Sequence, residues 1–250
     1  MVNLFRKIRK QLIERNDVVN YARYAVGEIV LIVIGILLAL YLNHLNTDRS
    51  IKADQIKILK EIKSNLKSST VSFERAISSE QNYMAYNLMI LDYLDHKKPY
   101  DSILDSAFGT YFWTISSSAV TGAYDYLKSK GIDLITNDQL RTKISFLYES
   151  ELLVLKNENE VWANNLQQNI SYPYHVKHFR KYYPDSKTAN DFEYAKPFNY
   201  DLLLNDAYFK SINAEIISNR RWNINSLQNT IDKIKMLRDD IDKELVLLDN

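Results

Sequence analysis

The 250-residue sequence contains no cysteine, only five glycines and only four prolines. Without cysteine the chain has no disulfide, no thiolate nucleophile and no cysteine-based metal site. Scarce glycine and proline leave few turn signals, and the long stretches between them favour helices over an all-β fold. Because 32 Lys and Arg residues are balanced by 31 Asp and Glu residues, the net charge is only +1. A nucleic-acid partner is therefore not expected.

Sequence motifs that mark a reaction centre are also missing. No dinucleotide-binding or phosphate-binding glycine loop, nucleophile elbow or H-E-x-x-H motif occurs. His175 and His178 form a close pair among the four histidines, but no third ligand accompanies them, so we predict no metal site and no cofactor. Carboxylates and lysines are interspersed at helical spacing, and Arg220 and Arg221 are expected to add to this surface charge. These patterns predict a protein that is not an enzyme.

One long apolar run lies near the N-terminus, from Ala25 to Leu42. As a helix, a run of this length spans about 27 Å, close to the roughly 30 Å hydrocarbon core of a bilayer. The residues after it, NHLNTDRS, lack the small-residue pattern of a signal-peptide cleavage site. We predict an uncleaved transmembrane helix at 25–42, with a basic amphipathic segment at 1–24 before it and a helical domain at 43–250 after it.

The segment before the span carries basic residues on one side of an amphipathic pattern. Arg6, Lys7, Arg9 and Lys10 are expected to lie on an anionic membrane lipid surface. Six Lys or Arg residues occur in the first 24 positions, whereas four occur in the eighteen positions after the span. The positive-inside rule then favours a cytoplasmic N-terminus and an extracytoplasmic C-terminal domain.

Two features of the span itself suggest more than anchoring. Small residues recur every four positions on one face, which lets another membrane helix approach closely and predicts a homo-oligomer or a membrane protein partner. Glycine also occurs in lone spans, so lipid contact alone is the alternative. Glu28 is either a functional ionisable group or a shallow carboxylate that reaches the headgroups. The residues of the small-residue face are Gly27, Leu31, Gly35 and Ala39.

The rest of the chain is predicted to form long helices. No glycine or proline interrupts 46–96, and its apolar residues keep three-to-four spacing, as in one long helix. A second helical region is expected over 101–130, although its Ser, Thr and aromatic stretch favours an interruption. Apolar residues in heptad positions over 224–248 predict a final coiled-coil-like helix.

The sequence contains specific signals for the end of the second helix and the start of the third. Gly131 suits a left-handed position after a helix end. Thr136 and Gln139 fit a capping box that starts a third helix, which is expected to run to about Asn169. With short connections, the four helices predict an antiparallel up-down-up-down bundle.

A long aromatic-rich connection is expected at 172–209, where three prolines interrupt the helical pattern. The topology places it at the membrane-distal end. Its aromatic side chains are expected either to pack over the bundle end with their hydroxyls hydrogen-bonded, or to form a partner-binding surface. These side chains are Tyr172, Tyr174, Phe179, Tyr182, Tyr183, Phe192, Tyr194, Phe198 and Tyr200.

Three stretches resemble an uncharacterised family of single-pass membrane proteins of flavobacteria and their relatives. They are FRKIRKQLIERN, YARYAVGEIVLIVIGILLALYLN and AYDYLKSKGIDLITNDQLRTKISFLYE. Gly27 and Glu28 fall on the family's span pattern, whereas the family's Trp after the span is missing here. The resemblance implies a Gram-negative inner membrane location with a periplasmic domain, and it implies no activity.

The sequence therefore predicts an all-α protein with one transmembrane helix and an extracytoplasmic antiparallel bundle. The leading functional hypothesis is a membrane-anchored interaction or scaffold protein that self-associates or binds a partner. One alternative is a periplasmic small-molecule sensor that acts through a partner, because bundles bind ligands between helices. The other is an ion-coupled membrane subunit that uses Glu28.

Overall fold

The computed structural model describes residues 18–184 and 194–249, and it confirms an all-α fold. The chain divides into two compact units, of which the first ends at Gln55 and the second begins at Ile56. We call the second unit the helical domain. The basic residues Arg6, Lys7, Arg9 and Lys10 lie outside the described residues, as does Phe192 of the aromatic connection.

The first unit contains the start of helix α2, which runs from Val18 to Asp95. Its residues from Ala25 onward form a helix that is long and apolar enough to cross a membrane. Large apolar side chains there are open to the surroundings, such as Leu31 at 65% and Leu40 at 60% exposure. Such a continuous apolar surface is unfavourable in water, and lipid is the environment that suits it.

In the helical domain, α2 supplies Ile56–Asp95, and the prediction of one long helix over 46–96 is confirmed. Its inward side chains belong to two clusters. Ile62 and Leu66 are buried in the first cluster, and Ile90 and Leu94 in the second. Their three-to-four spacing is what the burial of one helix face requires.

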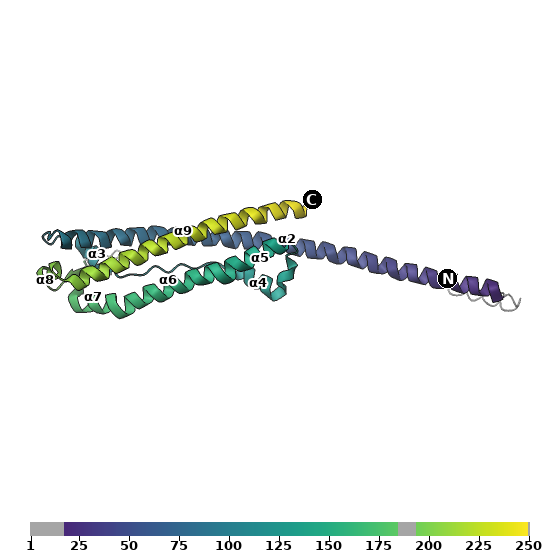
Figure 1. Cartoon of the computed structure of the whole chain (residues 1–250), viewed down its shortest axis with the longest axis horizontal. Coiled ribbons are helices and arrows are strands. Elements are labelled where there is room, and N and C mark those ends of the chain that lie inside the picture. The colour runs from purple at the N-terminus through teal and green to yellow at the C-terminus, as the bar shows by residue number, and fades with distance from the viewer. Residues whose placement is uncertain (1–17, 185–193, 250) are drawn as a thin grey trace. The chain divides into compact units, whose positions relative to one another are not determined.

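The second helix is not continuous. Helix α3 (Leu104–Thr110) and helix α4 (Gly122–Lys130) are separated by a stretch without regular structure. Ile115 and Ala119 of this stretch pack against the first cluster, and the Val120 N–H donates to Ser69 Oγ at 2.9 Å. The expected interruption of the second helical region is therefore confirmed, and an extended segment of chain joins α3 to α4 (Figure 1).

The corner after α4 differs from the prediction in detail. Gly131 has φ 105° and ψ 123°, so its φ is positive but its ψ is not that of a left-handed helix. A single 3₁₀ turn, η1 (Ile132–Leu134), follows. The cap of helix α5 (Asp138–Phe146) is Asn137, one residue beyond the predicted Thr136, because Asn137 Oδ1 accepts from the Leu140 N–H at 3.1 Å.

The third helical stretch runs past its predicted end at Asn169 and reaches His178. Pro173 does not break it because Pro173 lies just after a π-helical turn, where the regular i→i−4 hydrogen-bond ladder is already interrupted. A π-helical turn directly before α7 changes the helix register. The consecutive elements are π-turn η2 (Leu147–Glu151), helix α6 (Leu152–Leu166), π-turn η3 (Gln167–Ser171) and helix α7 (Tyr172–His178).

The aromatic connection is also more regular than predicted. Strands β1 (Phe179–Lys181) and β2 (Ala195–Pro197) pair antiparallel, with Arg180 opposite Lys196. Helix α8 (Tyr200–Leu204) follows and begins with an Asn199 side-chain cap. The final helix, α9, then runs from Ala207 to Asp249.

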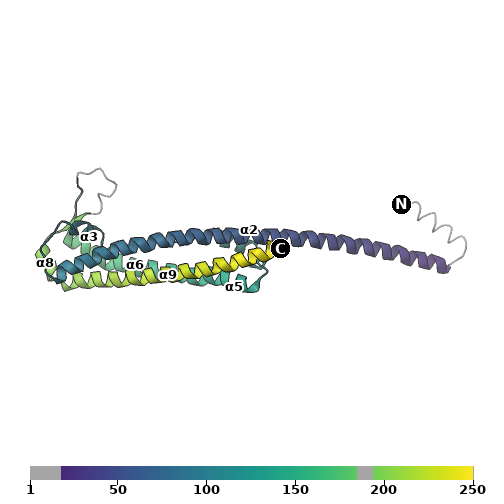
Figure 2. The ribbon, with the colours of Figure 1, turned by 90° about the horizontal axis from the view of Figure 1, so that it is seen from above.

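Helix α9 lies antiparallel to α2 within the helical domain (Figure 2). Lys63 forms an ion pair with Asp242, and Asn87 donates to Asn213 Oδ1 at 3.0 Å. Residues early in this part of α2 therefore meet the end of α9, and later residues meet its beginning. Among the described residues, α2, the α5–α7 stretch and α9 are the three long helical elements of the domain.

Candidate functional site

The small-residue face of the span is open in the single chain. A side-chain carbon built on Gly27 or on Gly35 meets no atom within 4 Å. Leu31 is 65% exposed, and Ala39 is exposed as well. Glu28 lies on the same helix and is half-buried. This face therefore has the space for a second helix that its sequence spacing predicts.

Two residues of the expected partner surface are core residues. Tyr174 and Phe179 are 6% and 3% exposed and belong to the second cluster. The Tyr174 ring stacks on Phe209 with centroids 5.0 Å apart, and its hydroxyl donates to Asp206 at 2.6 Å. For these two residues the packing interpretation holds, because α7 and β1 turn them toward α9.

Other aromatic residues of the connection hold it to the rest of the domain. The Tyr182 hydroxyl donates to the buried Asp105 carboxylate at 2.6 Å, and Tyr100 donates to the same carboxylate. Desolvation and the bond to Asp105 raise the pKa of Tyr182 to about 12. The Tyr200 hydroxyl donates to the Lys98 carbonyl at 3.0 Å.

The remaining described aromatics of the connection are on the surface or close to it. Tyr172, Tyr183 and Phe198 are 51%, 69% and 65% exposed. Tyr194 is half-buried, with its ring 5.8 Å from that of Tyr182. The expected partner surface is thus reduced to a few separate side chains around a packed hairpin.

The two close histidines point to different neighbours. His175 is 3% exposed, and its ring lies between Phe112 at 4.5 Å and Phe179 at 5.2 Å. Burial, with the nearby Lys181 charge, lowers the pKa of His175 to about 4. The His178 ring instead stacks on Tyr174 at 4.1 Å. Both rings serve aromatic packing.

A buried ion pair occupies the middle of the helical domain, and sequence reasoning missed it. Arg220 of α9 and Glu80 of α2 have side chains only 3% and 4% exposed. Arg220 was expected at the surface with Arg221, and that expectation is wrong. A signal for burial was present, because Arg220 lies four residues after Ile216 and seven before Leu227 on one helix face.

The ion pair is the centre of a hydrogen-bond network. The Arg220 guanidinium donates to the Trp113 carbonyl at 2.7 Å and to Asn87 Oδ1 at 3.1 Å. Asn223 donates to the Glu80 carboxylate at 2.8 Å. The network joins α2, α9 and the chain segment that follows α3. Because buried charges need such partners, it fixes the register of these three elements.

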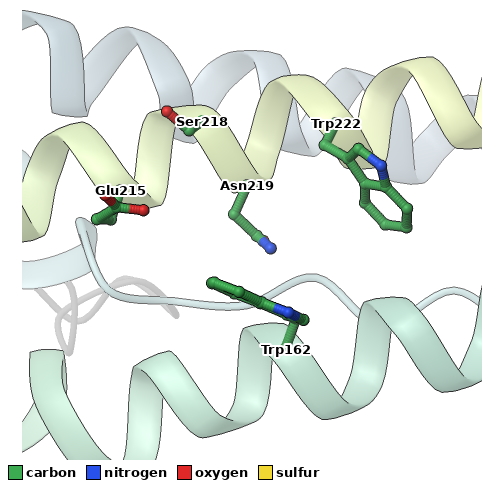
Figure 3. A pocket seen from close by; sticks show the side chains of 5 residues that line it. All are labelled: Trp162, Glu215, Ser218, Asn219 and Trp222. Atoms are coloured by element: carbon green, nitrogen blue, oxygen red, sulfur yellow. The ribbon is translucent and has the colours of Figure 1, made fainter.

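An open groove lies on the surface beside this network, between α6 and α9 (Figure 3). Its volume is about 380 Å³. Trp162 of α6 and Trp222 of α9 are 60% and 41% exposed. In Figure 3, the Trp162 ring lies below the Asn219 side chain, and the Trp222 ring projects from α9 toward α6. The described lining residues are Trp162, Glu215, Ser218, Asn219 and Trp222.

The groove adjoins a second, smaller pocket of about 20 Å³, which has room for a single water molecule. Asn219 lines both spaces, and Glu80 and Arg220 line the smaller one. Gln167 and Ser171 of the π-turn η3 also line it. Asn219 is therefore shared by the groove and by the pocket that the buried ion pair lines.

Fold and site together define a class: an all-α protein with a helix able to cross a membrane and a helical domain that carries an aromatic surface groove. The profile of the Family of unknown function (DUF6090) matches residues 28–182, and the chain belongs to this family. The match includes Glu80 and Trp162 but not the α9 side of the groove. No curated protein and no solved structure matches the chain significantly.

Proposed function

We propose that this protein is a membrane-anchored, non-enzymatic interaction protein whose helical domain binds a partner in the groove between α6 and α9. In this proposal the span crosses the inner membrane, the N-terminus is cytoplasmic, and the helical domain is periplasmic. The observation that carries it is the exposure of Trp162 and Trp222 on facing helices of one groove.

Exposed indoles are a physical argument for binding. Trp is enriched among the residues that contribute most to protein–protein affinity, because it buries a large rigid surface. Two indoles at 60% and 41% exposure leave much of this surface in water. The groove volume of about 380 Å³ is also within the range of roughly 300–1,000 Å³ that is usual for binding sites.

Self-association through the span is the membrane part of the proposal. The open space at Gly27 and Gly35 supports it, because close helix approach in lipid depends on such small residues. A second chain packed there presents two helical domains to the same compartment, and a partner then meets two grooves. Two linked sites raise the effective affinity without new contacts.

A small-molecule sensor is the second candidate function. It is favoured by the small pocket next to the groove, because Asn219 lines both spaces and the Arg220–Glu80 pair lines the smaller one. A ligand that displaces Asn219 changes the packing of α9 against α2. The sensing readout then requires a partner that detects this change.

Photocrosslinking in native membranes tests the proposed function. A photoreactive amino acid is placed at Ser218 in the groove, and in a control chain at Gln228, which is exposed on another face of α9. We expect a discrete crosslinked protein from position 218 and not from position 228. Equal, diffuse labelling at the two positions contradicts partner binding in this groove.

A further inference from the structure

We infer that the groove between α6 and α9 receives a cationic side chain, an arginine or a lysine presented by the partner protein. This inference deepens the proposed function and rests on it. It concerns the chemistry of the bound group, which neither the family match nor the membrane helix addresses.

The lining of the groove follows one face of α9. Glu215, Asn219 and Trp222 are spaced by four and three residues, so they lie in a row along the helix. Trp162 faces this row from α6 (Figure 3). A group that enters the groove therefore meets a carboxylate at one end of the row and an indole at the other, with a second indole opposite.

The charge of this lining selects a cation. Indole faces attract ammonium and guanidinium groups through the ring quadrupole, and Trp is the most effective aromatic residue for this. A carboxylate adds a charge-assisted hydrogen bond to the same groups. Among the described lining residues Glu215 is the one charged group, and neither lysine nor arginine is present to neutralise it. An anionic ligand is repelled by the Glu215 carboxylate and by the negative faces of the indole rings, and is therefore disfavoured.

The surroundings of the groove favour a polypeptide over a free small cation. The groove is open to solvent, and Trp162 and Trp222 keep 60% and 41% of their surface exposed. A small cation that enters the groove leaves much of both indoles in water. A partner chain that inserts one basic side chain covers them with its neighbouring residues, which is the usual anatomy of a central anchor with a surrounding contact area.

Peptide binding to the full chain in lipid nanodiscs tests the inference. The probe is a terminally blocked Gly-Gly-Arg-Gly-Gly peptide, and its neutral counterpart carries citrulline, which has the same shape without the charge. Tryptophan fluorescence reports binding at millimolar peptide concentrations. We expect the arginine peptide to bind about tenfold more tightly than the citrulline peptide, the size of one desolvated cation–π contact.

Two variants connect this preference to the groove. Glu215→Gln is expected to remove most of it, whereas Glu74→Gln, an exposed carboxylate on α2, is expected to keep it. Equal binding of the two peptides, absence of arginine-peptide binding, or an unchanged preference in Glu215→Gln overturns the inference. Arginine amide that binds as tightly as the peptide overturns the assignment to a partner protein.

The failures of the two proposals are distinguishable. A specific crosslink at Ser218 together with equal binding of both peptides leaves the interaction function in place and removes the cation. Loss of the crosslink at Ser218, with the arginine preference retained, removes the partner protein but leaves a cation site.

Discussion

The Arg220 guanidinium on α9 and the Glu80 carboxylate on α2 form an ion pair that is almost closed to solvent, with side chains 3% and 4% exposed. A buried pair contributes little net stability by itself, because each charge loses its hydration. Removing one partner is costly, however, since the other charge stays buried and unpaired. A shift of α9 along α2 that separates the pair therefore carries the same cost.

The first prediction concerns this pair. Glu80→Ala leaves the Arg220 guanidinium without its carboxylate and is expected to lower the free energy of unfolding by about 3–5 kcal/mol. Urea unfolding of the full chain in detergent micelles, followed by circular dichroism, measures the loss. Glu74→Ala, at an exposed position of the same helix, is expected to change the free energy by less than about 0.5 kcal/mol. Equal losses in the two variants contradict the structural role of the pair.

The second prediction compares two glycines. Gly131 has φ 105°, where a residue with a side chain is strained, although a side-chain carbon there meets no atom within 4 Å. Gly131→Ala is thus expected to destabilise the protein by about 1–3 kcal/mol through the backbone alone. Gly122 also has open space but begins helix α4, so Gly122→Ala is expected to stabilise by up to about 1 kcal/mol. Thermal unfolding of both variants gives the signs, and a stabilising Gly131→Ala contradicts the described corner.

The third prediction is a pH dependence from His175. Its folded-state pKa is about 4, below the ordinary 6.5, so the unfolded chain binds more protons between these pH values. The neutral imidazole then contributes stability that is fully present above pH 6.5 and is lost as the pH falls toward 4. The loss is on the order of 3 kcal/mol. His175→Phe keeps a ring between Phe112 and Phe179 and is expected to flatten the stability curve over this range, and an unchanged slope contradicts the buried neutral histidine.

Periodic patterns were sufficient to predict the long elements. The spacing of apolar residues predicted the helix over 46–96 and the final helix, because one buried face repeats every 3.6 residues whatever the partner is. The apolar run from Ala25 predicted a helix long and apolar enough to cross a membrane. These helices depend on local sequence patterns, so they can be predicted without knowing their tertiary contacts.

Features that depend on tertiary partners were not predictable in the same way. Pro173 indicated a helix break, but the π-turn before α7 places it where its missing N–H is harmless. Arg220 looked like surface charge because its partner Glu80 lies far away in the sequence. Trp162 and Trp222 of the groove come from separate helices, and the sequence does not show that these helices meet.

The fourth prediction tests the membrane orientation. Because the chain has no cysteine, a single Ser129→Cys substitution on the exposed surface of α4 gives one thiol to label. In intact spheroplasts, a membrane-impermeant maleimide is expected to label this thiol without lysis, since the helical domain is proposed to be periplasmic. Labelling that appears only after lysis contradicts the orientation and places the groove in the cytoplasm.

Crosslinking from Ser218 in two variant backgrounds tests the central claim, that Trp162 and Trp222 form a partner-binding groove, most directly. Trp162→Ala removes one wall of the groove, whereas Val176→Ala removes an exposed apolar side chain elsewhere on the same helical stretch. The crosslinked yield is expected to fall about tenfold or more with Trp162→Ala, as for a central anchor residue. The yield is expected to be unchanged with Val176→Ala. Equal yields in both backgrounds would contradict the claim.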